Sequence, residues 1–307
     1  MSAHLSYVEA VIVGAAQGVT ELFPVSSLGH SVLVPALIGG QWAQDLNVSG
    51  PESPYLAFIV GLHVATAAAL LVFFWRDWLR ILAGFVSSAR HRRIQTSDER
   101  LAWLIVAATI PVGLAGLLLE QLFRTTLGKP IPAAVFLILN GAALYAGEVL
   151  RRRTAPVPAQ DHRTPDDEHA AHAGEAIDDR IAQLPIGRGA LIGSAQILAL
   201  LPGISRSGIV IVAGLWRGLS HEDAARFSFL LATPIILAAG VYKIPDLFGP
   251  LGAGVGGQVL AGSIASFVCA YLAVRYLTGY FQTRTLTPFA IYCALVGTAS
   301  LAWLTLR

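Results

Sequence analysis

Long apolar runs alternate with short polar stretches along this chain, and their lengths predict membrane-spanning helices. A helix needs about 20 mostly apolar residues to cross the hydrocarbon core of a bilayer. The pattern therefore predicts an all-α, polytopic membrane protein with about six full spans. These spans lie at about 56–75, 101–120, 131–150, 225–243, 257–278 and 287–306.

Two further apolar stretches, at about 8–38 and 187–219, are interrupted by Pro24 and Pro202. Proline removes a backbone donor and clashes with the preceding helical turn. Non-helical backbone persists at membrane depth only where it is buried in protein or lines a water-filled cavity. We therefore expect each stretch to form a re-entrant helix–loop–helix, with both loops facing one shared cavity.

Composition supports a membrane protein and narrows its partners. Hydrophobic residues make up 55% of the chain and charged residues 13%, against about 25% charged residues in soluble domains. The formal net charge of +2 gives no reason to expect a nucleic-acid partner. Cys269 and Cys293 lie in apolar stretches without metal-binding spacing and are expected to be inert thiols. The first apolar segment lacks the features of a cleavable signal peptide and should stay in the protein.

One segment, 151–185, differs from the rest in composition and predicts a disordered cytoplasmic linker. It begins with three arginines and continues with prolines and carboxylates, a composition that cannot build a core. It separates a first half, 1–150, from a second half, 186–307. Three histidines in the linker leave a weak metal site open, but a solvated stretch is the favoured interpretation; they are His162, His169 and His172.

The two halves resemble each other in sequence. Gly14-x-x-Gln17 in the first matches Gly193-x-x-Gln196 in the second, and proline and serine follow in both. The matching features occur in the same order, which predicts an internal duplication.

Basic residues predict that the two copies have opposite orientations. The segment 76–100 contains six arginines, and three more begin the linker. By the positive-inside rule both face the cytoplasm. The counterpart of the first segment in the second half, 244–256, has no basic residue and should lie outside. Equivalent loops on opposite sides indicate inverted-topology repeats, with the N-terminus outside.

The first interrupted stretch carries the motif 17–30, whose polar residues suit acid–base and nucleophilic chemistry. Glu21 precedes Pro24 by about one turn, and His30 follows Ser26 and Ser27 by about one turn. Such groups are costly to keep in a membrane, which makes them candidates for function. A structural carboxylate, a core histidine and serines that only cap a helix are the alternatives.

The second motif, 196–208, places Arg206 between Ser205 and Ser207. A guanidinium presents a planar set of donors that suits phosphate oxygens. A halide or a carboxylate could take the place of phosphate, and an arginine that extends to the membrane surface is a further alternative.

These two motifs resemble those of the bacterial undecaprenyl pyrophosphate phosphatase family, the bacitracin-resistance type. The first family pattern, Glu or Gln, three residues, Glu, then Pro-Val-Ser-Ser-x-Gly-His, corresponds to Gln17–His30. The second, Pro-Gly-x-Ser-Arg-Ser, corresponds to Pro202–Ser207. The resemblance extends to His63 with Thr66, to 227–234 and to 288–292.

The resemblance implies an enzyme that removes the terminal phosphate of undecaprenyl pyrophosphate. The product is the lipid carrier reused in peptidoglycan synthesis, and the activity confers bacitracin resistance. Mg²⁺ or Ca²⁺ would support the reaction. The protein would lie in the bacterial cytoplasmic membrane among lipids, with its site open to the periplasmic face; a homodimer stays open.

The resemblance also implies roles for single residues. Glu21 would serve the metal or act as base, with Gln17 as a weaker metal ligand, and either Ser27 or His30 would be the nucleophile. The phosphates would be held by Arg206, Ser26, Ser205 and Ser207. Gln17 cannot supply a second anionic ligand, a threonine of the family pattern is replaced by Val210, and Leu28 stands where a small or polar residue is more usual.

A polyprenyl-phosphate flippase or transporter is the alternative function. Inverted repeats with broken helices near the bilayer midplane are typical of transporters. Transport requires no nucleophile, so Ser27 and His30 favour the enzyme.

Overall fold

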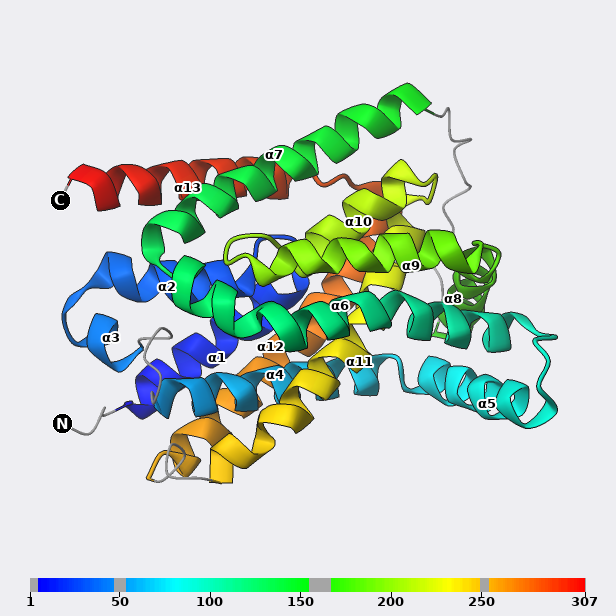
Figure 1. The fold of residues 1–307 in the computed structure, drawn as a ribbon, viewed down its shortest axis with the longest axis horizontal. Coiled ribbons are helices and arrows are strands. Elements are labelled where there is room, and N and C mark those ends of the chain that lie inside the picture. The colour runs from blue at the N-terminus through cyan, green and yellow to red at the C-terminus, as the bar shows by residue number, and fades with distance from the viewer. Residues whose placement is uncertain (1–4, 47–53, 155–166, 249–253, 307) are drawn as a thin grey trace.

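The computed structural model describes residues 5–46, 54–154, 167–248 and 254–306, and every regular element in these ranges is helical (Figure 1). This confirms the all-α prediction. Each of the six predicted spans coincides with a long helix. These helices are α4 (Pro54–Phe73), α6 (Ser97–Leu127), α7 (Pro130–Thr154), α11 (His221–Phe248), α12 (Gly256–Thr283) and α13 (Thr287–Leu306).

Five of these helices are individually long and apolar enough to cross a membrane, within the described residues. The sixth candidate is the apolar part of α4 with α5 (Trp75–His91), which follows it after a bend of 86°. The structure is therefore that of a polytopic membrane protein.

The two proline-interrupted stretches form broken helices, as predicted. In the first, α1 (Tyr7–Leu22) ends just before Pro24 and α2 (Ser27–Ile38) follows, leading to the short helix α3 (Gly40–Asp45). In the second, α9 (Ile186–Ser194) tightens into the 3₁₀ helix η1 (Ala195–Leu200), and α10 (Arg206–Trp216) begins after the loop. Figure 1 shows the pairs on opposite sides of the molecule, with α1 and α2 toward the end that carries both termini. Their origin by duplication stays a prediction.

Glycines let the broken helices approach the spans closely. A Cβ atom at Gly14 of α1 would lie 2.2 Å from the carbonyl oxygen of Gly262 in α12. A Cβ atom at Gly193 of α9 would lie 2.2 Å from the carbonyl oxygen of Ala108 in α6. Small residues at such contacts are the usual device for packing helices in membranes. The matching glycines of the two halves thus do the same packing work.

The prediction of a disordered linker at 151–185 is wrong for residues 151–154, which end α7, and for residues 167–182, which form α8 (Asp167–Ala182). Its apolar residues, Ile177 and Ile181, are buried. Asp178 is buried as well and forms ion pairs with Arg226 at 2.7 Å and with Arg80 at 2.9 Å. Composition alone marked this segment as solvated, because it cannot show which distant arginines will pair with an aspartate. Residues 155–166, including His162, lie outside the described residues, as do the side chains of His169 and His172.

Candidate functional site

The two loops meet at the centre of the molecule and bind each other. The Ser26 hydroxyl accepts hydrogen bonds from the backbone N–H groups of Gly29 and Gly203, both at 3.2 Å. Asn140 of α7 bridges the loops, because its amide donates to the Pro24 carbonyl at 3.0 Å and accepts from the Ser205 N–H at 2.9 Å. These bonds satisfy buried backbone groups at Pro24, Gly29, Gly203 and Ser205.

The crossing point of the loops requires unusual backbone. Gly203 has a φ of +113°, and a Cβ atom on Gly29 would lie only 2.9 Å from the Gly203 Cα atom. Ser26, which is not glycine, has a φ of +69°. Such conformations persist where the surroundings fix them, and they concentrate at functional sites. The residue directly after Ser26 is Ser27, at the start of α2.

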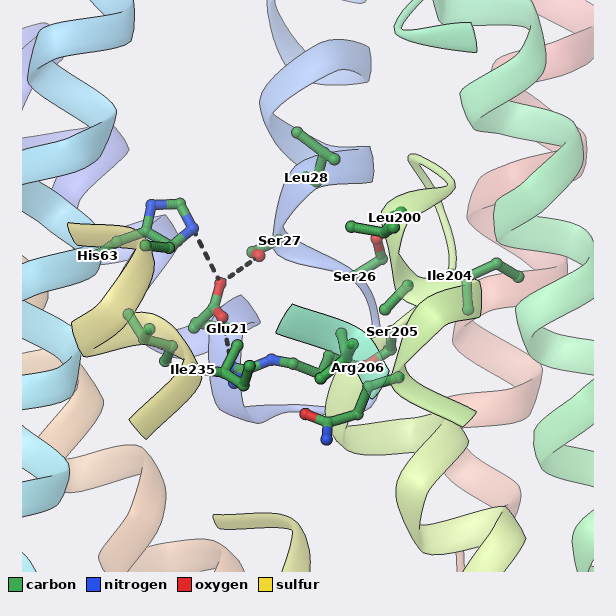
Figure 2. Close-up of a pocket in the computed structure, with 15 residues that line it drawn as sticks. Glu21, Ser26, Ser27, Leu28, His63, Leu200, Ile204, Ser205, Arg206 and Ile235 are labelled. Atoms are coloured by element: carbon green, nitrogen blue, oxygen red, sulfur yellow. Dashed lines mark hydrogen bonds and ion pairs between the residues drawn. The ribbon is translucent and has the colours of Figure 1, made fainter. Parts of the chain in front are cut away.

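A cavity of about 220 Å³ opens beside the crossing, and side chains from both loops line it (Figure 2). Its polar lining residues are Glu21, Ser26, Ser27, His63, Gln196, Ser205 and Arg206. Its apolar lining residues are Leu28, Val112, Ala199, Leu200, Ile204, Ile235, Ile236 and Ala239. The prediction of one cavity shared by both loops is confirmed.

Glu21 is the centre of the polar contacts. It is 8% exposed, and its Oε1 atom accepts a hydrogen bond from Nη2 of Arg206 at 2.6 Å. Its Oε2 atom accepts from the Ser27 hydroxyl and from the Gln17 amide, the latter at 2.9 Å. A carboxylate and a guanidinium in this setting neutralise each other, and removing either would leave an uncompensated charge.

His63 of α4 also faces the Glu21 carboxylate, and the sequence analysis gave it no role (Figure 2). Its Nδ1 atom lies 2.9 Å from the carbonyl oxygen of Ile59. Its Nε2 atom lies 3.3 Å from the Gln17 amide nitrogen and 3.6 Å from Glu21 Oε2. The signal that could have found it is an ionisable residue inside an apolar span.

His30 does not line this cavity. Its Nδ1 atom lies 2.7 Å from the Ser26 carbonyl and its Nε2 atom lies 2.8 Å from the Tyr292 hydroxyl. The one-turn spacing after Ser26 is as predicted, but the ring meets the backbone of that serine and not its hydroxyl. His30 therefore supports the loop from the side of α13.

The remaining predicted residues fall into two groups, those that line the cavity and those that lie behind its lining. Both serines are buried, but Ser205 lines the cavity and Ser207 does not. Both hydroxyls donate to the Phe23 carbonyl, at 3.4 and 3.3 Å. Gln17 is 3% exposed and lies behind Glu21. The structure thus brings Glu21, Ser26, Ser27, Ser205 and Arg206 together at the cavity. It places Gln17, His30 and Ser207 behind that lining.

The donor set suits a divalent cation that arrives with a phosphate ligand. Among the described residues there is no group of three or more His, Cys, Asp or Glu side chains placed to hold a metal ion. Glu21 is the one carboxylate of the cavity lining. The Oε1 atom of Gln196 adds a buried amide oxygen that has no hydrogen-bond partner in the described part of the chain. Mg²⁺ is commonly held by one or two carboxylates together with substrate phosphates, so these residues fit such an ion.

Comparisons with known proteins identify the family of this chain. Undecaprenyl-diphosphatases of Mycolicibacterium paratuberculosis and Mycobacterium avium are each 83% identical to this chain over 307 residues. The match covers the full length of this chain and of each relative. Undecaprenyl-diphosphatase 1 of Frankia casuarinae is 51% identical and covers 95% of this chain and 96% of its own. The model of the bacitracin resistance protein BacA family matches residues 10–299, and the chain belongs to that family.

Proposed function

We propose that this protein is an undecaprenyl-diphosphatase that converts undecaprenyl diphosphate to undecaprenyl phosphate and inorganic phosphate. The observation that carries the proposal is the Ser27 hydroxyl, hydrogen-bonded to Glu21 in a cavity that also contains Arg206. The names of the relatives support the substrate. The reaction returns the lipid carrier to peptidoglycan synthesis, and this recycling underlies bacitracin resistance.

Ser27 acts as the nucleophile, and Glu21 acts as its base. Glu21 Oε2 takes the hydroxyl proton as the Ser27 oxygen forms a bond to the terminal phosphorus. The bond from that phosphorus to the bridging oxygen breaks, and its electron pair leaves with the lipid monophosphate. Water then cleaves the phosphoserine and releases inorganic phosphate. A positioned base of this kind typically contributes about 10²–10⁴-fold in rate.

Arg206 changes partner during the cycle. In the structure its guanidinium donates to Glu21 at 2.6 Å and to the Ala232 carbonyl at 3.2 Å. A diphosphate offers it stronger oxygen acceptors, and a fixed guanidinium stabilises charge on the transferring phosphoryl group. Release of Glu21 from Arg206 leaves the carboxylate free to accept the Ser27 proton.

Glu21 would hold Mg²⁺ or Ca²⁺ together with the substrate, and the ion would neutralise part of the negative charge of the diphosphate. Gln17 presents its amide N–H to Glu21 and thereby holds the carboxylate in place. Ser26 and Ser205 fix the loops on the two sides of the phosphate position.

The apolar wall of the cavity suits the isoprenoid part of the substrate, and the surrounding spans place the site in a membrane. The arginine-rich segment 76–100 supports a cytoplasmic location for its end of the molecule. The proposal accordingly has the site open to the periplasmic side of the cytoplasmic membrane. A homodimer stays a prediction.

The test is release of inorganic phosphate from undecaprenyl diphosphate, radiolabelled on its terminal phosphate, by the purified full-length protein. A quench in neutral denaturant, which preserves phosphoserine and phosphohistidine alike, is followed by mapping of the phosphorylated residue. We expect phosphate release and label on Ser27. Label on His30 would contradict the nucleophile assignment. Full activity in both Glu21→Ala and Arg206→Ala would contradict the site itself.

The flippase alternative has no support in the names of these relatives. Movement of the lipid across vesicles by the purified protein, without phosphate release, would favour it over the enzyme.

A further inference from the structure

Helix α5 has two faces, and one of them has no protein partner in the described structure. Ile81, Gly84 and Ser88 are buried, and a Cβ atom on Gly84 would lie 2.8 Å from the backbone nitrogen of Glu99 in α6. The opposite face carries four apolar side chains that are between 53% and 64% exposed. They are Trp75, Leu79, Leu82 and Val86.

These four residues recur at intervals of four, three and four, which places them on one stripe of the helix. The stripe begins directly where α4 ends, and α5 turns away from α4 by 86°. A helix at right angles to a span, attached to its end, runs along the plane of the membrane surface. The apolar stripe of α5 therefore lies where it can contact the lipid acyl chains just below the headgroups.

The carboxylates around α5 face the protein, whereas most of its arginines lie on the exposed surface. The aspartates face the protein, because Asp77 pairs with Arg80 at 2.8 Å and with Arg226 at 2.9 Å, and Asp98 pairs with Arg80 at 3.0 Å. Asp178 of α8 completes this cluster. One arginine of α5 is thereby turned inward and is excluded from the surface.

The cations that remain on the surface are all exposed and lie beside the stripe. Arg76 and Arg90 are almost four helical turns apart, and thus on one flank of the helix. Arg92 and Arg93 follow directly after its end. The nearby carboxylates are engaged elsewhere: Asp77 and Asp98 pair with inward-facing arginines. Glu99 is buried and accepts hydrogen bonds from Ser87 and from the Gln95 N–H. The surface next to the apolar stripe is left basic.

We propose that α5 lies in the headgroup layer of one leaflet and that Arg76, Arg90, Arg92 and Arg93 bind the phosphates of anionic phospholipids. An apolar stripe flanked by arginines is the pattern of a helix held at a membrane surface. Anionic headgroups complement the exposed charge, whereas a zwitterionic leaflet does not. The proposal is independent of the phosphatase reaction.

The test compares binding of fluorescent phosphatidylglycerol and phosphatidylcholine by the full-length protein in detergent. The variant Arg90→Gln/Arg92→Gln/Arg93→Gln should bind phosphatidylglycerol roughly tenfold or more weakly, since each arginine near an anionic surface adds attraction. The matched control is Arg188→Gln/Arg217→Gln/Arg284→Gln, which removes the same charge from exposed arginines elsewhere. It should change affinity by less than about twofold. Equal losses in both variants, or no preference for phosphatidylglycerol in the unaltered protein, would overturn the proposal.

A nitroxide label tests the position of the helix separately. In a chain with Cys269→Ser and Cys293→Ser, a label at Leu82→Cys in phosphatidylglycerol-containing bilayers should be more accessible to oxygen than to a water-soluble nickel chelate. A label at Arg92→Cys should show the reverse. Water-like accessibility at both positions would overturn the proposal, whatever the lipid-binding result.

Discussion

The two broken segments build their turns in the same way and place different chemistry on them. In each, a serine caps the second helix and accepts a hydrogen bond from a glycine N–H three residues later, Ser26 from Gly29 and Ser205 from Gly208. The first residue after the cap is Ser27 in one segment and Arg206 in the other. The cap is a structural requirement in both segments, so the next position is where the segments can differ.

The same division holds nine residues before each capping serine. Gln17 and Gln196 precede their capping serines by the same interval in the sequence. Gln17 donates to Glu21, whereas the Gln196 amide donates to the Gly193 carbonyl within its own segment. The first segment holds the reacting groups, and the second holds the cation that receives the phosphate.

The largest effect should come from Ser27→Ala. Loss of the nucleophile should reduce phosphate release about 10³-fold or more, because no other hydroxyl contacts Glu21 among the described residues. Single-turnover assays with radiolabelled substrate measure it. The matched change in the second segment, Ser205→Ala, is the control, and an equal loss there would refute the division of roles.

Arg206→Lys should have the next largest effect. An ammonium keeps the charge but loses the planar set of donors, so kcat/KM should fall about 10–100-fold. Full kinetics with increasing substrate measure this fall. A variant that behaves like the parent protein would mean that the second segment does not hold the phosphate.

Gln17→Glu should have a smaller effect, on cation dependence. A second carboxylate beside Glu21 adds a charged oxygen ligand, so the Mg²⁺ concentration for half-maximal activity should fall by roughly fivefold. Titration of the metal after removal with a chelator gives this value. An unchanged midpoint would show that no cation approaches Glu21 from the Gln17 side.

Ser205→Ala should have the smallest effect on activity and a clear effect on stability. Loss of a helix cap typically costs about 1 kcal/mol, while the Asn140 contact to the Ser205 backbone remains. Thermal unfolding in detergent should show a lower midpoint, with phosphate release within about threefold of the parent protein. A large loss of activity without a shift in the midpoint would assign the Ser205 hydroxyl to the phosphate.

The spans and the two breaks could be predicted from the sequence because their causes are local. An apolar run of sufficient length and a proline within it are visible in one stretch of residues. The shared cavity was also predictable, since non-helical backbone such as that of Pro24 and Pro202 needs protein around it.

Contacts between distant segments could not be predicted. His63 lies on α4, and nothing within its span shows that Glu21 of α1 will face it. The order of α8 depends on Arg80 and Arg226, which are far from Asp178 in sequence. His30 has the spacing that predicts contact with Ser26, but its ring contacts the Ser26 carbonyl and also the hydroxyl of Tyr292 in the distant helix α13.

The hydrogen bond from Gly203 to Ser26 has a consequence for biosynthesis. Chains emerge from the ribosome N-terminus first, so the first broken segment enters the membrane long before residue 203 exists. Until then the Ser26 hydroxyl lacks the Gly203 N–H and the Glu21 carboxylate lacks the Arg206 guanidinium, while Gln17, Ser27 and Gly29 of the same segment are already present. The negative charge of Glu21 therefore receives its arginine partner only after the second broken segment has entered the membrane.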